Sequence, residues 1–476
     1  MLKDDILLGI FNYYRLDEYF WNIRLGWRKL SHICRRWRQL IFSSAFHLGM
    51  HIWCTNDSLT VDTLDHLPPL PLFIDFKERI KDLFELWEES LVVRNEDESG
   101  IYHALRLRDR VRRINLSVSP PTLDEYFRVM DKPFPILEHL SLSLTGYAML
   151  ALPSGFLAPN LCHLDLDIRL PKRLRLLCST PSLVTLKLTN IRASGYFRPR
   201  LLVARLESLP QLEDLSIGFS IPIPRPSSER LLLGKQGIPV MLSNLKSLTF
   251  RGVSVYLERL ISLIRAPVLR ELDITLFNQL AFTLPHLSHF VNITEEIKFT
   301  HTAAIDFHPG SFITLTHYGG FKLCVKCRSS DWQMDCAAQI CSALMSALSG
   351  VETLNIGGQI YSLLGSDSET DEVDDTIGSR TWHELLRLFV NVKELHIDHN
   401  FSAELSRALE VDEIGLDPGL LPDLQEIVGH YRGPMPADSM FGSFIHARQA
   451  AGRPVLFFLS SPPTPLYMPS PPSSPS

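Results

Sequence analysis

The sequence lacks several features that would define a class of protein directly. Its 476 residues hold only eight cysteines, which is too few for a disulfide scaffold, so we expect the thiols to be reduced. No uninterrupted apolar run approaches the roughly 18 residues that span a bilayer. The first residues, MLKDD, place acids where a signal peptide needs cations. These absences favour a soluble protein of the cytoplasm or nucleus that contacts no membrane.

Excess positive charge and catalytic motifs are also missing. The net charge is −6, and only residues 1–46 are basic, with eight Lys or Arg against four Asp or Glu. A general nucleic-acid binder is expected to be more basic. Cys324 and Cys327 have zinc-like spacing, yet Cys336 and Cys341 complete no paired motif, and no histidine lies within the set. We expect no enzyme activity, metal, cofactor or nucleic-acid partner.

What the sequence does contain is an internal leucine repeat. A proline-rich entry precedes L-x-x-L-x-L in FPILEHLSL, residues 134–142, and in APNLCHLDL, residues 158–166. Six strong copies have middle leucines spaced 24, 22, 29, 33 and 24 residues apart, and weaker copies lie near 111–116, 351–356, 392–397 and 424–427. These spacings are typical of leucine-rich repeats. The pattern predicts an α/β fold, an irregular leucine-rich-repeat solenoid.

The alternation within each copy predicts which side chains face outward. In L-x-L the two leucines share one face of a short strand, so parallel stacking buries a leucine row and exposes a polar row. Helical spacing over 173–177 and 255–264 predicts the returning, convex side. We predict that the polar row lines the concave surface, which is a candidate contact surface for another protein. The candidate residues are His139, Ser141, His163, Asp165, Asp167, Lys187, Ser216, Thr249, Arg251 and Asp273.

A second feature is the stretch WRKLSHICRRWRQLIF, residues 27–42. Its apolar residues lie at 30, 33, 34, 37, 40 and 41, which is one stripe of a 3.6-residue repeat, and its five Lys or Arg fall largely outside that stripe. The pattern predicts one amphipathic helix. Such a helix can lie on a membrane, bind phosphates or pack its apolar stripe against protein.

The motifs around this helix resemble a known family. LKDDILLGIF at 2–11, a spacer at 12–26 and ICRRW at 33–37 resemble an F-box, whose pattern is L-P-x-E-I-L-x-x-I-F followed by V-C-x-x-W. HICRRWR at 32–38, FSS at 42–44 and LDHLPPLP at 64–71 are similar to F-box-like leucine-rich-repeat proteins of mushroom-forming fungi. Lys3 stands where the F-box pattern has proline, and the spacer is longer than usual.

The resemblance implies a role in protein degradation. F-box helices dock on the Skp-type adaptor of a cullin-RING (SCF) ubiquitin ligase, while the repeats hold the substrate. A unit of about 45 residues buries too little core to be stable alone, which agrees with a need for a partner. An alternative is a leucine-rich-repeat scaffold outside any ligase. The candidate adaptor-binding residues are Leu2, Ile6, Leu7, Ile10, Phe11, Leu30, Ile33, Cys34 and Trp37.

The predicted domains follow from these patterns. A three-helix F-box-like unit spans 1–46, and a linker or helical adaptor region spans 47–105. The solenoid spans 106–458 and contains a disordered acidic loop at about 365–377, where the sequence reads SDSETDEVDD. A disordered Pro/Ser-rich tail spans 459–476.

Overall fold

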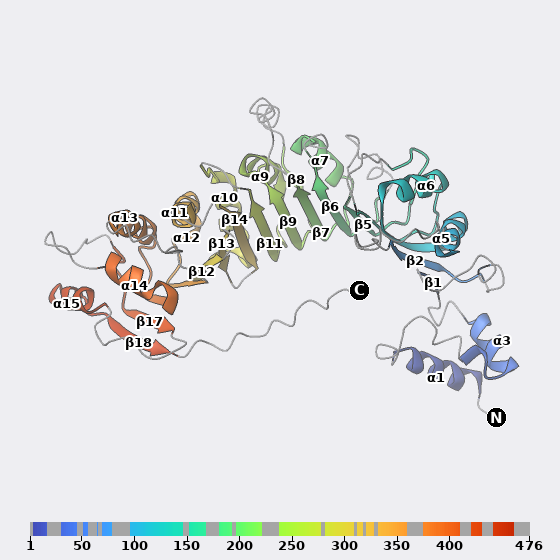
Figure 1. Ribbon diagram of the computed structural model, residues 1–476, viewed down its shortest axis with the longest axis horizontal. Helices are drawn as coiled ribbons and strands as arrows, with labels where there is room; N and C mark the ends of the chain where they lie inside the picture. Colours follow the sequence, from blue (N-terminus) through green and yellow to red (C-terminus); the bar gives the residue numbers. More distant parts are fainter. Residues whose placement is uncertain are drawn as a thin grey trace, which may run out of the picture. The chain divides into compact units, whose positions relative to one another are not determined.

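The computed structural model describes most of the chain in two compact units. The described residues are 3–16, 30–44, 51–55, 64, 69–78, 96–145, 152–167, 180–192, 197–220, 238–277, 281–308, 312–317, 320–327, 332–358, 375–409, 420–430 and 441–460. Unit 1 comprises Met1–Phe197 with Ala204–Ser216, and unit 2 comprises Arg198–Val203 with Ile217–Ser476. Both units combine parallel strands with helices (Figure 1).

Unit 1 builds a parallel sheet in the order β1-β2-β3-β4-β5-β6. Its strands are β1 (Ile52–Cys54), β2 (Leu72–Lys77), β3 (Val111–Val118), β4 (His139–Leu144), β5 (His163–Asp167) and β6 (Thr185–Ile191). Its helices are α1 (Asp4–Leu16), α3 (Arg35–Ser43), α5 (Glu96–Arg106) and α6 (Pro120–Met130). Helix α7 (Pro199–Leu206) and strand β7 (Asp214–Phe219) each contain residues of both units.

The sheet of unit 1 begins earlier than the sequence predicted. Residues 47–105 were expected to be a linker or helical region, but β1 pairs with β2 and β2 pairs with β3, all in parallel. The cause is the alternation in β2, where Leu72, Ile74 and Phe76 are buried between half-buried neighbours. Residues 67–72 read LPPLPL and have the L-x-x-L-x-L spacing, so the leucine repeat could have indicated this strand.

Unit 2 builds a second run of strands in the order β9-β11-β14-β13-β12-β15-β16-β17-β18. They are β9 (Ser247–Gly252), β11 (Glu271–Leu276), β12 (Thr302–His308), β13 (Phe312–His317), β14 (Phe321–Lys326), β15 (Thr353–Gly358), β16 (Glu394–Asp398), β17 (Glu426–His430) and β18 (Leu456–Ser460). A separate pair joins β8 (Val240–Met241) to β10 (Ile264–Arg265).

The helices of unit 2 cover one side of its sheet (Figure 1). They are α9 (Ser254–Ile261), α10 (Pro285–Ile293), the short η5 (Glu295–Ile297), α11 (Gln333–Ala343), α12 (Met345–Leu348), α13 (Asp375–Leu386), α14 (His399–Ala408) and α15 (Gly442–Ala450). The predicted helix at 255–264 is therefore confirmed in α9, although Ile264 belongs to β10. The predicted helical stretch at 173–177 lies outside the described residues.

One part of unit 2 departs from parallel stacking. Strand β13 pairs antiparallel with both β12 and β14, so a three-strand meander stands between β11 and β15. The outer strands of the meander keep parallel partners, because β14 pairs with β11 and β12 pairs with β15. The alternation of faces is preserved through the meander, since antiparallel pairing also sets like-facing residues opposite each other.

The core of both units is the predicted leucine row. In unit 1, Leu140, Leu164 and Leu186 are paired across β4, β5 and β6 and are at most 1% exposed. In unit 2, Leu354 and Leu395 are paired in the same way and are fully buried. Burial of each such side chain contributes about 1.5–3 kcal/mol. The mixed α/β fold with long parallel sheets is consistent with the predicted leucine-rich-repeat solenoid.

The predicted single helix at 27–42 is wrong in one respect. The chain is helical at Leu30 and Ser31, turns at His32 and Ile33, and restarts as α3 after Cys34. Cys34 is extended, with φ −157° and ψ 166°, and its Sγ accepts a hydrogen bond from the Trp37 backbone N at 3.4 Å. This N-cap ends one helix and starts another, which apolar periodicity alone does not reveal.

The other predicted boundaries can be compared with the structure only in part. The predicted acidic loop overlaps α13, which begins at Asp375, and its residues 365–374 lie outside the described part of the chain. The predicted tail overlaps β18, which includes Leu459 and Ser460, and the remaining tail residues are likewise outside it. Residues 17–29, where part of the three-helix unit was predicted, are also not described. Among the described helices, none has the length and apolarity that a bilayer crossing requires.

Candidate interaction surfaces

Helices α1 and α3 form a pair with a small shared core. The Phe11 and Trp37 rings meet edge to face with centroids 4.9 Å apart, and Leu7, Phe11 and Ile41 are at most 3% exposed. An ion pair of 2.6 Å joins Arg36 to the Asp4 carboxylate at the start of α1. An apolar seam and a surface ion pair therefore help to join the two helices.

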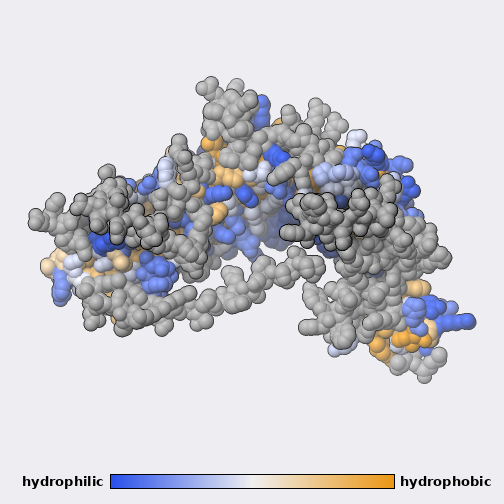
Figure 2. Space-filling view, in the orientation of Figure 1, coloured by the Kyte–Doolittle hydropathy of each residue, from blue (hydrophilic) through white to orange (hydrophobic). Residues whose placement is uncertain are grey.

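Three isoleucines lie outside this seam. Ile6 is 49% exposed, Ile10 44% and Ile33 58%. Ile6 and Ile10 are four residues apart, so they lie next to each other along α1. Figure 2 shows hydrophobic atoms beside hydrophilic atoms over this pair of helices. We call Ile6, Ile10 and Ile33 the isoleucine patch.

The described members of the predicted adaptor-binding set divide into buried, half-buried and exposed residues. Leu7 and Phe11 are buried in the seam, and Leu30 and Trp37 are half-buried. Cys34, which follows Ile33 in the chain, is exposed. Leu2 lies outside the described residues. The exposed large apolar side chains in the described part of the pair are therefore the isoleucine patch and Tyr13, which is 74% exposed.

The open face of the unit 1 sheet carries the predicted polar row. Strand pairing sets His139 beside His163, and Ser141 beside Asp165 and then Lys187. All five side chains are half-buried or exposed, whereas the leucines between them are buried. The predicted alternation of faces is confirmed here. Their role as substrate contacts remains a prediction.

Hydrogen bonds organise this row. The ring Nδ1 of His163 lies 3.1 Å from Thr185 Oγ1, which donates to Asp214 Oδ2 at 3.2 Å. Ser143 donates to Asp167 Oδ2 at 3.5 Å. These contacts run from strand to strand, so the row is a connected surface.

Burial and neighbouring charges perturb two groups in this row. Burial, followed by the charges of Arg113, His163 and Lys187, lowers the pKa of His139 to about 4. Burial raises the pKa of Asp165, an effect that Lys187 opposes. The His139 ring is consequently neutral at physiological pH and can accept or donate hydrogen bonds.

An aromatic cluster on the first strands is absent from the sequence-based candidates. His51 stacks on Phe73 with centroids 3.9 Å apart, and Trp53 meets Phe73 edge to face at 5.4 Å. The Arg113 guanidinium lies over the Trp53 ring at 5.9 Å. These side chains continue the open face beyond His139, since Phe73 pairs with Arg113 and Arg113 with His139. Their alternation with buried residues is the signal that could have found them.

The remaining candidates lie on β7, β9 and β11. In unit 1, Ser216 is a half-buried residue of β7. In unit 2, Thr249 pairs with Asp273, whose carboxylate lies 3.9 Å from Lys322 Nζ. Arg251 is exposed and lies 5.9 Å from the Phe277 ring. The open face of β9, β11 and β14 therefore carries charges of both signs.

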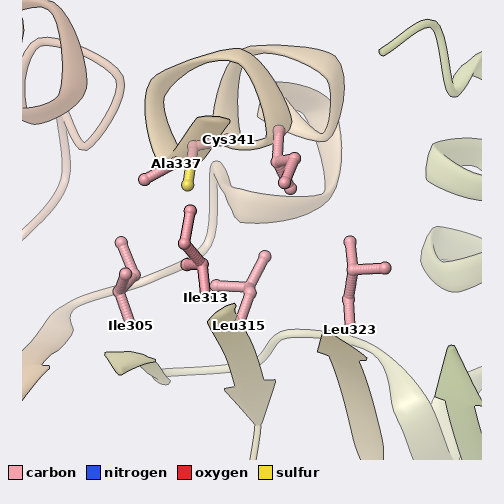
Figure 3. Close-up of a pocket in the computed structure, with 7 residues that line it drawn as sticks. Ile305, Ile313, Leu315, Leu323, Ala337 and Cys341 are labelled. Atoms are coloured by element: carbon pink, nitrogen blue, oxygen red, sulfur yellow. The ribbon is translucent and has the colours of Figure 1, made fainter. Parts of the chain in front are cut away.

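The cysteines of unit 2 have packing roles. Cys336, Ile340 and Cys341 are buried residues of α11. A small apolar cavity separates α11 from the meander and is lined by Ile305, Ile313, Leu315, Leu323, Ala337, Ile340 and Cys341 (Figure 3). Burial raises the pKa of Cys341 to about 12, so this thiol is protonated and unreactive.

Comparisons with known proteins leave the function open. No model of a protein family matches the chain, and a search of curated proteins finds no match. Among solved structures, the chain aligns with the leucine-rich repeat-containing protein LegL7 from Legionella pneumophila. The identity is 13%, the alignment covers 86% of this chain and 99% of that chain, and the TM-score is 0.26. This TM-score is too low to carry an argument, so the repeat assignment rests on strand register and burial.

Proposed function

We propose that this chain is a substrate receptor of an SCF-type ubiquitin ligase and has no catalytic activity of its own. In this proposal, α1 and α3 dock on a Skp-type adaptor through the isoleucine patch, and the open face of the strands holds a protein substrate. The observation that carries the proposal is the exposure of Ile6, Ile10 and Ile33 on a helical pair that carries the F-box-like motifs.

The isoleucine patch is suited to a protein partner on energetic grounds. Burial of a large aliphatic side chain contributes about 1.5–3 kcal/mol, so three isoleucines supply several kcal/mol before the costs of association. The same helical pair carries exposed cationic residues, among them Arg35 and Arg38 of α3. These cations favour a partner with an acidic surface and increase its association rate.

The test is capture of a Skp-type adaptor by the full chain. We expect Ile6→Asp combined with Ile33→Asp to abolish capture, because two charges would enter the buried centre of the contact. The matched control is Ile293→Asp in α10, which removes an isoleucine that is also 58% exposed but lies in unit 2. Thermal unfolding of the variants must match the wild type, since the changed side chains contact solvent.

A second candidate is an interaction scaffold that never enters a ligase. It is favoured by Lys3, which replaces the proline of the F-box pattern and is exposed. A folded wild-type chain that captures no adaptor at micromolar concentrations would support the scaffold and contradict the ligase proposal.

A further inference from the structure

The last three strands of unit 2 present an open face of unusual composition. Along β16, β17 and β18 the outward positions alternate with inward ones, and the inward positions of β16 and β17 are buried. The outward residues are Glu394, His396, Asp398, Glu426, Val428, His430, Leu456, Phe458 and Ser460. Three are acids and none is Lys or Arg, in contrast to β9 and β14, which present Arg251, Lys322 and Lys326.

Strand register places the acids next to apolar side chains. Glu394 pairs with Glu426, which pairs with Leu456. In the next row, Val428 pairs with Phe458. Leu456 is 56% exposed and Phe458 is 47% exposed. An acidic strip therefore lies directly beside an exposed apolar strip.

The polar contacts of Glu394 and Asp398 involve neutral or titratable groups. Glu394 accepts a hydrogen bond from Thr353 Oγ1 at 3.4 Å and lies 3.7 Å from His396 Nε2. Asp398 caps α14 by accepting from Asn400 N at 3.2 Å and lies 2.5 Å from His399 Nδ1. The strip thus keeps a negative potential that a cationic ligand can neutralise.

Strand β18 adds an accessible edge. In the described part of the sheet it pairs with β17 alone. Edge strands are commonly protected by charged residues or proline, but β18 reads LFFLS and has neither. An extended peptide that lies along such an edge can make main-chain hydrogen bonds in addition to side-chain contacts.

We propose that this terminal face, formed by Glu394, Asp398, Glu426, Val428, Leu456 and Phe458, binds an extended protein segment that contains both Lys or Arg and large apolar residues. The cations would lie against the acidic strip, and the apolar side chains would cover Leu456 and Phe458. Nucleic acids and anionic lipids are disfavoured because their charge is of the same sign as the face. This proposal depends on the proposed function in one respect: both assume that the open face of the strands is the face that binds the protein substrate.

The probe is a fluorescent peptide built from repeats of Arg-Arg-Leu-Leu, which in an extended conformation presents both residue types on each side. We expect the full chain to bind it, as measured by fluorescence anisotropy. Glu394→Gln with Glu426→Gln should weaken binding about tenfold, as should Phe458→Ser. Peptides with glutamate in place of arginine, or serine in place of leucine, should not bind.

Matched controls separate local from general effects. Glu295→Gln with Glu296→Gln removes two exposed acids from η5, and Ile293→Ser removes an exposed isoleucine from α10. These variants should bind the peptide as the wild type does. Equal weakening by the control and test variants, or no binding by the wild type, would overturn the proposal.

Two further measurements complete the test. If sedimentation shows that the chain self-associates and that Phe458→Ser prevents this, the occupant is a second copy and the proposal is overturned. Adaptor capture is measured on the same variants and should be unchanged. If neither the wild type nor any variant captures the adaptor, the ligase role is refuted. Peptide binding by the wild type would still show that the terminal face binds an extended segment.

Discussion

A buried carboxylate at the start of α10 offers a sharp test of how the repeats are held together. Glu258 in α9 is 9% exposed and accepts hydrogen bonds from the backbone N of His286 at 2.8 Å and of Leu287 at 2.9 Å. Pro285 occupies the first turn and has no N–H, so Glu258 satisfies the next two backbone donors of the helix. The carboxylate thereby joins the consecutive helices α9 and α10.

The expected magnitude follows from the two hydrogen bonds that alanine cannot make. A hydrogen bond to a charged acceptor contributes about 1.5–3 kcal/mol, and the burial cost of the carboxylate, which alanine removes, offsets part of the total. We expect Glu258→Ala to lower the free energy of unfolding of unit 2 by about 2–4 kcal/mol. Burial raises the pKa of Glu258, so its ionisation opposes folding, and this cost decreases as pH falls through the folded-state pKa.

The assay is urea unfolding followed by circular dichroism, with amide exchange at Leu287 as a local readout. Glu258→Gln should fall between wild type and alanine, because the amide oxygen still accepts a hydrogen bond and carries no charge. Glu295→Ala, which removes an exposed acid from η5, is the control. If Glu258→Ala unfolds within about 0.5 kcal/mol of the wild type with unchanged exchange at Leu287, the capping argument is refuted.

Three other outcomes are expected. Arg448, 3% exposed, donates to the carbonyl oxygens of Pro422 and Leu424 at 3.1 Å each, so Arg448→Met should destabilise unit 2 by about 2–4 kcal/mol in urea unfolding. Gly320 has φ +95° and its added Cβ would lie 2.0 Å from the Arg270 carbonyl oxygen, so Gly320→Ala should lower the unfolding midpoint, whereas Gly442→Ala should not. His139 should titrate near pH 4 by NMR, and stability should fall as pH decreases from 6.5 towards 4 because the unfolded chain binds that proton first.

The sequence predicted the elements whose burial follows a simple period. Leu140 and Leu142, or Leu164 and Leu166, are buried in strands because L-x-L sets both leucines on one face. The same alternation predicted that His139 and Asp165 face outward, which the structure confirms. For the candidate contact residues, the two-residue period of the sequence predicted which face of the sheet each side chain occupies. It did not predict the net charge of each part of that face, because this depends on which strands become neighbours.

The features that the sequence did not predict also have physical causes. The interruption at Cys34 depends on one extended residue and a thiol cap, and neither changes the apolar period. Strand β1, whose buried residues are Ile52 and Cys54, follows no L-x-x-L-x-L segment. The exposure of Ile33 follows from the interruption at Cys34, because the turn directs it away from the seam that Trp37 enters.

The meander explains how the sheet of unit 2 can change the charge of its open face without interrupting its core. Inward residues remain aligned through it, since Ile274 pairs with Leu323, Leu323 with Leu315, and Ile305 with Ile356. Outward positions carry no such constraint, because solvent accepts any polar side chain. The meander, whose strand β14 carries Lys322, thus stands between β9, which carries Arg251, and β16 and β17, whose ionisable outward residues are acids and histidines. A solenoid built this way can offer surfaces of different charge on one continuous hydrophobic row.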